Sequence, residues 1–333
     1  MINKKTSIFL LKAIVSISLL TFLLTKIDWH TVTKNLHNAN LFLLLIAIFL
    51  NVVERFELTY KWNLLIKVRG IVVKFGRLFW INSIGSFLGL FLPSSLGTDV
   101  VRGYYLVKNN SERSVSISSV FVDRVLGLIS LLLLGLVSLL FAGNLVSKFN
   151  LNLYLAVLTF ITLVGVYFFQ RNETKKILEL LFIKMKQHKI IEYAMKLHGS
   201  ILEYKKYPKT LLLSFVITIL VQVTRVLTYY AVAAAFDIEI SIVYFFLFVP
   251  LIMIVMMLPI TIGGLGLREG TFVAFFTMIG MSVNDAVVIT FINSILDTLN
   301  TIILGGGGYL FYKSTLKDQI ALAKSVEVLK SNE

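Results

Sequence analysis

Long apolar runs separated by polar connections make up most of this chain. A helix needs roughly 20 residues to cross a bilayer, and six runs approach or exceed that length. They cover residues 7–25, 40–60, 116–142, 151–169, 210–236 and 286–312. The first run contains Lys12 and lacks a small-residue cleavage site, so we interpret it as a retained span rather than a signal peptide. The pattern predicts an all-α protein with about six full membrane spans.

Two further apolar runs are shorter, and each stops at a proline. They are 78–92, before Pro93, and 242–258, before Pro259. A third run, 271–281, is too short to cross alone. We therefore expect the two proline-ended runs to form half-helix elements rather than complete spans.

The distribution of basic residues indicates how these runs are oriented. Lysine and arginine are concentrated after the second span, in 171–209 and in the C-terminal tail. If 78–92 crossed completely, the most basic connection would lie outside the cell. If 78–92 enters and returns on one side, all three basic regions lie in the cytoplasm, as the positive-inside bias favours. We therefore expect re-entrant elements, cytoplasmic N- and C-termini, and a cavity around the irregular backbone.

The segment 171–209 predicts an amphipathic cytoplasmic helix. Within 174–201, apolar positions can share one face with lysines opposite, which is typical of a helix lying on the inner leaflet. A regulatory or partner-binding role is the alternative. We expect one integral membrane domain over residues 1–333.

Composition supports a membrane protein and excludes several other classes. Hydrophobic residues form 57% of the chain and charged residues 15%, with a formal net charge of +14, and the mean hydropathy is +0.85. Soluble domains are roughly 45–50% apolar. The basic excess lies on no polar domain that would bind nucleic acid, and it suits loops facing anionic lipid. With no cysteine and four scattered histidines, we expect no metal and no cofactor.

The two proline-ended runs begin related motifs. The first motif contains Pro93, Gly97, Asp99 and Arg102, and the second contains Pro259, Gly263, Gly264, Gly266, Arg268 and Glu269. In each, a glycine follows the proline after four residues and an arginine follows it after nine. The two prolines lie 166 positions apart (259 minus 93), which is about half the chain.

Flanking residues recur at similar offsets. Arg55 and Arg225 each precede a Leu-Thr-Tyr run and lie 170 positions apart (225 minus 55), and Asp123 and Asp297 lie 174 apart (297 minus 123). Glycines at such spacings also serve close packing of membrane helices, but three matches in the same order favour a repeat. With the orientation above, the halves, roughly 40–169 and 210–313, form an inverted-topology repeat whose broken helices build a transport site.

Ionisable residues within the spans are the candidate site. A charge at the bilayer centre costs on the order of 3 kcal/mol, so these groups must pair, reach an interface or line water. Arg102 and Arg268 suit bidentate phosphate contacts. Asp123 and Asp297 are either their partners or counter-ions for a cationic head group. The remaining candidates are Asp99 and Glu269 beside the two arginines, and Glu54, Arg55, Arg124 and Arg225 as structural or supporting ion pairs.

Several motifs are absent or explained by packing. The chain has no Walker A sequence, no Asp-x-Asp pair and no Ser/His/Asp set, so we expect no enzymatic activity. We expect the glycines at 305–308 to allow helix packing. We interpret Gly263-Gly264-Leu265-Gly266 as a break in the backbone, because it follows no strand.

With these residues in view, the chain resembles the lysylphosphatidylglycerol synthase transmembrane-region family, the flippase-like domain proteins. The resemblance rests on Arg55 with Trp62, on the segments 93–102 and 258–270, and on the acid-arginine pair Asp123-Arg124. It covers nearly the whole chain, and the segment 258–270 is its most specific part. The family often has glutamate where this chain has Asp123. Larger members carry a soluble aminoacyl-transferase domain, whereas this chain stops at Glu333, so we expect no lysyl transfer.

The resemblance implies movement of a lipid, often aminoacylated or glycosylated, between leaflets. The leading hypothesis is therefore a lipid flippase in the cell membrane, with membrane lipids as its partners. The alternative is a non-catalytic membrane subunit that supports a separate synthase or glycosyltransferase. An intramembrane enzyme is the third hypothesis, and no visible nucleophile or metal set favours it.

Overall fold

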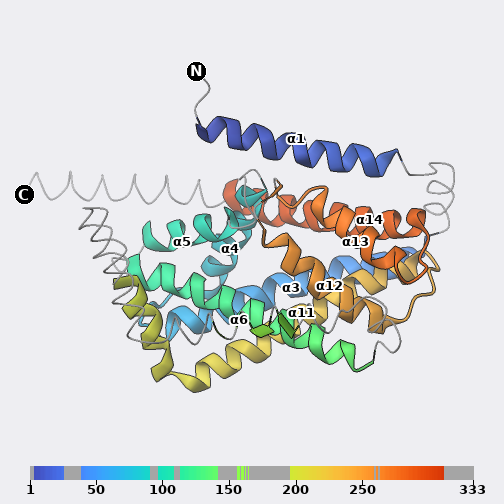
Figure 1. Cartoon of the computed structure of the whole chain (residues 1–333). Helices are drawn as coiled ribbons and strands as arrows, with labels where there is room; N and C mark the ends of the chain where they lie inside the picture. The colour runs from blue at the N-terminus through green and yellow to red at the C-terminus, as the bar shows by residue number, and fades with distance from the viewer. Residues whose placement is uncertain are drawn as a thin grey trace, which may run out of the picture.

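The computed structural model shows a bundle of helices that lie alongside one another (Figure 1). The structure describes residues 4–25, 39–90, 97–108, 113–141, 156–157, 159–160, 162, 164, 196–258, 260–261 and 263–310. Pro93, Pro259, most of the predicted span 151–169 and most of the segment 171–209 lie outside the described residues. The described secondary structure is helical throughout, in agreement with the predicted all-α class.

After α1 (Lys4–Leu24), the described helices include two runs of four that have the same order of lengths. The first run is α3 (Leu41–Lys67, 27 residues), α4 (Phe75–Gly89, 15), α5 (Gly97–Lys108, 12) and α6 (Arg113–Leu139, 27). The second is α11 (Pro208–Ala235, 28), α12 (Ile242–Met256, 15), α13 (Leu267–Thr277, 11) and α14 (Val283–Thr301, 19). A π-helix, η2 (Ile302–Gly306), extends α14, and a 3-10 turn, η1 (Glu203–Lys206), precedes α11.

Three helices among the described residues are long and apolar enough to cross a bilayer. They are Ser114–Leu139, Pro208–Ala235 and Val283–Leu310. The helix α3 is equally long but contains charged residues, and it continues to Lys67 rather than ending near residue 60 as predicted. A count of consecutive apolar residues places the end of α3 too early, because the count stops at charged residues. Buried ion pairs allow the helix to continue past them.

The first helices of the two runs pack antiparallel. The backbone N–H of Asn40 donates to the carbonyl of Ala235 at 2.8 Å, and the Tyr204 hydroxyl donates to the carbonyl of Leu65 at 3.1 Å. These contacts define two ends of the bundle. The basic end carries Lys67, Lys74, Lys206 and Lys209, and the acidic end carries Asp237, Glu239 and Asp285. In the described residues, the acidic end has no lysine or arginine.

The short helices form two hairpins that enter the bundle from opposite ends. Leu78 near the start of α4 and Leu106 near the end of α5 share an apolar cluster at the basic end. The start of α12 and the end of α13 meet near the acidic end, where the rings of Phe245 and Phe276 are 4.8 Å apart. The tips meet inside, because a Cβ on Gly263 would lie 3.3 Å from the carbonyl oxygen of Leu90.

Glycines permit the closest approaches around these tips. Gly263, Gly264 and Gly266 have φ angles of +59°, +80° and +79°, left-handed conformations that favour glycine, and they lie between the end of α12 and the start of α13. Gly266 also lies under α1, which runs along the outside of α13 (Figure 1). Gly305 packs on α4, where any Cβ would clash with the carbonyl oxygen of Ser83. The prediction that the glycine run allows packing is therefore confirmed.

Candidate functional site

Two adjoining cavities lie beside the hairpin tips. Cavity A has a volume of about 280 Å³ and includes Asp297 in its lining. Cavity B has a volume of about 250 Å³ and includes Asp123. The residues that line both are Leu58, Ser86, Thr98, Arg225, Met253 and Met256. The predicted cavity is therefore present, and it has two compartments with a shared wall.

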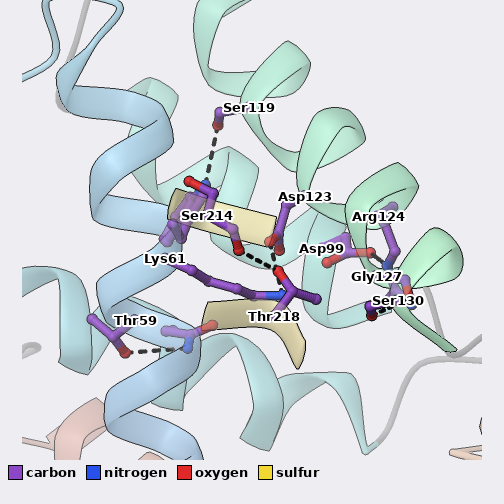
Figure 2. A network of polar contacts seen from close by, with 12 residues as sticks. Thr59, Lys61, Asp99, Ser119, Asp123, Arg124, Gly127, Ser130, Ser214 and Thr218 are labelled. Atoms are coloured by element: carbon purple, nitrogen blue, oxygen red, sulfur yellow. Dashed lines mark hydrogen bonds and ion pairs between the residues drawn. The ribbon is translucent and has the colours of Figure 1, made fainter. Parts of the chain in front are cut away.

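The Asp123 cluster forms one side of cavity B. The carboxylate of Asp123 lies 2.9 Å from Lys61 Nζ and 2.7 Å from Arg102 Nη2, and Arg102 lies 2.8 Å from Asp99. Arg124 donates from Nε to the other oxygen of Asp99. Figure 2 shows Lys61 extending from α3 toward Asp123 on α6. The five side chains form a continuous chain of alternating charges.

Local sequence and packing hold this cluster in place. Asp99 lies in the first turn of α5 and Arg102 one turn later, so both side chains share a face. The Arg102 guanidinium lies 5.1 Å from the ring centre of Trp62, whose Nε1 donates to Ser119 at 3.1 Å. A Cβ on Gly85 would lie only 3.3 Å from Arg102 Cβ, so α4 and α5 are in close contact. Arg102 is consequently buried and immobilised.

The Asp297 cluster forms the corresponding side of cavity A and is looser. Asp297 lies 3.3 Å from Arg55 and 3.4 Å from Arg268, and its side chain is 43% exposed. Arg55 also donates to the hydroxyl groups of Ser86 and Thr301. The contacts of Asp123 with Arg102 and of Asp297 with Arg268 correspond to the first of the two alternatives that the sequence left open for these aspartates. Asp123 is closed in by its partners, whereas Asp297 faces open space.

Glu269 lines neither cavity. Its Oε2 accepts from the backbone N–H of Gly266 at 2.7 Å, which caps α13. Its Oε1 accepts from the Ser294 hydroxyl and from Arg268 Nε at 3.2 Å. These contacts occupy both oxygens of a side chain that is 1% exposed. Contact with a head group stays a prediction for Glu269, and its observed contacts are structural.

Arg225 occupies a more central position than the sequence indicated. It pairs with Glu54 on α3, and its Nη1 donates to Gln222 at 3.0 Å. It is also the only cation that lines both cavities among the described residues. The sequence analysis gave Arg225 a supporting role, because it assigned the phosphate contact in the second half to Arg268 of the proline-containing motif.

Lys61 is a site residue that sequence reasoning missed. It was counted with the basic connection after the second span, yet it is 6% exposed and paired with Asp123. Helical spacing was the available signal. Glu54, Leu58 and Lys61 follow one another at intervals of four and three residues, which places them on one face of a continued helix.

The lining carries more positive than negative charge. The cations are Arg55, Lys61, Arg102, Arg124, Arg225 and Arg268, and the carboxylates are Glu54, Asp99, Asp123 and Asp297. Six against four leaves a surplus of two positive charges. Hydroxyl and amide groups complete the lining: Asn51, Asn82, Ser86, Thr98, Gln222, Thr228, Tyr229, Asn293 and Thr301. Such a surface suits an anionic, hydroxyl-bearing ligand. Within the described residues, no group of His, Cys, Asp and Glu could hold a metal ion.

Comparison with known families gives one match that spans most of the chain. The model of the lysylphosphatidylglycerol synthase TM region matches residues 9–305. No curated protein and no solved structure matches. The matched range contains both hairpins and every residue that lines the two cavities.

Proposed function

The chain belongs to the lysylphosphatidylglycerol synthase TM region family, and on that premise we propose that it is a lipid flippase. Its substrate would be a phospholipid or another lipid with a phosphate-bearing head group. The observation that carries the proposal is the pair of adjoining cavities, which Arg225 lines on both sides. A polar head group needs such a route because bare hydrocarbon provides no hydrogen-bond partners.

The proposed arrangement in the membrane places the basic end in the cytoplasm. The positive-inside bias supports this orientation, and it makes both termini cytoplasmic. The hairpins α4–α5 and α12–α13 would then be re-entrant elements from opposite leaflets. The equal order of helix lengths and the antiparallel packing of α3 and α11 support an inverted repeat. The cell membrane is the proposed location.

The head group would pass from one cavity to the other along the shared wall. The Arg225 side chain is 23% exposed and lines both cavities, so it would offer a contact to the phosphate. Arg268 and Arg124 line one cavity each and would hold the phosphate on either side. Met253 and Met256 are flexible side chains that allow the partition to deform. No ATPase motif is present, so movement would be downhill or coupled to an ion gradient.

Reconstitution tests this proposal directly. Purified protein in liposomes would receive fluorescent phosphatidylglycerol, and a membrane-impermeant quencher would report how fast the label leaves the inner leaflet. We expect acceleration by the native chain and loss of it in the double variant Glu54→Gln, Arg225→Gln. That variant removes an ion pair as a unit, so neither buried charge is left uncompensated.

The expected decrease in the flipping rate follows from the contact between Arg225 and the phosphate that the double variant removes. Hydrogen bonds to charged groups contribute about 1.5–3 kcal/mol, which corresponds to a rate reduction of about ten- to hundredfold. Arg77→Gln is the matched control, because Arg77 is an exposed arginine of α4 that lines neither cavity. A native chain that accelerates no phosphate-bearing lipid, or a double variant as fast as the control, would contradict the proposal.

A further inference from the structure

Glu57 lies in the middle of α3, one turn after Glu54, and is not part of either cavity lining. Its Oε1 accepts a hydrogen bond from the Thr224 hydroxyl at 3.1 Å. Its Oε2 is buried and receives no hydrogen bond. A buried carboxylate oxygen without a donor is costly when it is charged, and the cost is greater inside a membrane.

The other carboxylates inside the described bundle each have a cation within ion-pair distance. They are Glu54, Asp99, Asp123, Glu269 and Asp297. Glu57 has no such pair among the described residues. Glu57 can therefore bind a proton without the loss of an ion pair, in contrast to the five carboxylates above.

We propose that Glu57 is a proton-binding site that takes up one proton when an anionic phosphodiester head group binds in the cavities. This inference rests on the proposed function and adds the coupling ion. The head group would carry one negative charge, as a phosphatidylglycerol phosphate does. The proton comes from water and is held on Oε2, the oxygen that receives no hydrogen bond in this structure.

Charge balance explains why the two binding events are linked. The six cations of the cavities face five paired carboxylates, the four of the lining and Glu269, so this set has a net charge of +1. Ionised Glu57 reduces that net charge to zero. A phosphate brings one negative charge, so the set returns to zero only when Glu57 is protonated. In a membrane interior, the neutral combination is strongly favoured.

The connection between Glu57 and the cavities is short. Thr224 contacts Glu57, and the next residue of α11 is Arg225, which lines both cavities and pairs with Glu54. A phosphate that contacts Arg225 therefore changes the charge felt by both glutamates on α3.

The other elements packed on α3 do not compete for this role. Asp123 on α6 is held by two cations, and Asp297 on α14 is held by Arg55 and Arg268. The Arg124 guanidinium on α6 pairs with Asp99. Arg77, the ionisable residue of α4, is exposed, and Lys61 on α3 itself is paired with Asp123. Glu54 and Arg225 are thus the charged groups that respond with Glu57.

A binding experiment in detergent tests the linkage without requiring transport. Purified protein would be titrated with fluorescent phosphatidylglycerol at several pH values, and fluorescence anisotropy would give the Kd. Uptake of one proton requires the Kd to rise as pH rises, by up to about tenfold per pH unit. In Glu57→Gln, which mimics the protonated side chain, we expect tight binding at all these pH values and no slope.

Two further variants make the result specific. Glu57→Asp keeps an ionisable group and should keep a slope, and Glu239→Gln makes the same chemical change at an exposed position of the acidic end. Equal slopes in the native chain and Glu57→Gln, no slope in the native chain, or no binding of phosphatidylglycerol would overturn the inference. A linked proton without lipid movement in liposomes would instead reject the flippase and leave the proton site standing.

Discussion

Replacing the aspartates at the two related positions of the halves should reduce the free energy of unfolding by very different amounts. Asp123→Asn and Asp297→Asn are the same chemical change, on α6 and α14 respectively. Asp123 is 5% exposed and lies within 2.9 Å of two cations, one of them Lys61. Asp297 is 43% exposed, and its cations are 3.3 and 3.4 Å away. We therefore expect the first variant to be far less stable than the second.

The size of each loss in unfolding free energy depends on which partners the nearby cations keep after the substitution. In Asp123→Asn, Lys61 loses the one carboxylate that it pairs with among the described residues, and leaving a buried charge uncompensated costs about 3–5 kcal/mol. In Asp297→Asn, Arg268 keeps Glu269 and Arg55 keeps two hydroxyl groups. Arg55 and Arg268 are each only 12% exposed, but both keep these partners and solvent screens the 43% exposed carboxylate, so we expect a smaller loss, about 0–1 kcal/mol.

Unfolding by sodium dodecyl sulfate in mixed micelles, followed by circular dichroism, would measure both losses. The double variant Lys61→Met, Asp123→Asn supplies a second test. It removes the stranded cation, so it should recover most of the stability that Asp123→Asn loses. Equal losses in the two aspartate variants, or no recovery in the double variant, would refute the argument from burial.

Three more outcomes are expected. Gly305→Ala should reduce the free energy of unfolding by about 1–3 kcal/mol through its clash with α4. Gly307 has open space around it, so Gly307→Ala should not have this effect. Equal effects in the same unfolding assay would contradict this packing. Burial raises the pKa of Tyr204 above its ordinary value of 10.0, so its contribution to stability should be constant below about pH 10 and fall as pH rises further. Tyr204→Phe should make the fall in alkaline unfolding curves smaller than in the native chain. A cysteine replacing Lys206 should resist a membrane-impermeant thiol reagent in intact cells, while one replacing Glu239 should react; the reverse result would reject the proposed orientation, and the native chain has no cysteine to interfere.

The helices and the candidate site could be predicted to different extents. Spans and half-helices were visible because the requirement for apolar length acts locally on consecutive residues. The candidate arginines and aspartates were visible because charges are rare in such runs. Their individual environments were not visible. Sequence reasoning treated Asp123 and Asp297 alike, although one is enclosed and the other faces a cavity.

The sequence by itself determined the membrane class, the family, the helical hairpins at Gly97 and Gly263, and the set of intramembrane charges. Only the tertiary structure decided which charges meet, because an ion pair joins residues far apart in the chain. It brought Lys61 to Asp123 and gave Arg225 a position that lines two cavities. Within the part of the chain that the structure describes, it left Glu57 without an ion-paired cation. The physical reason is that burial and pairing depend on how whole helices pack, whereas apolar length and residue type can be read along one helix at a time.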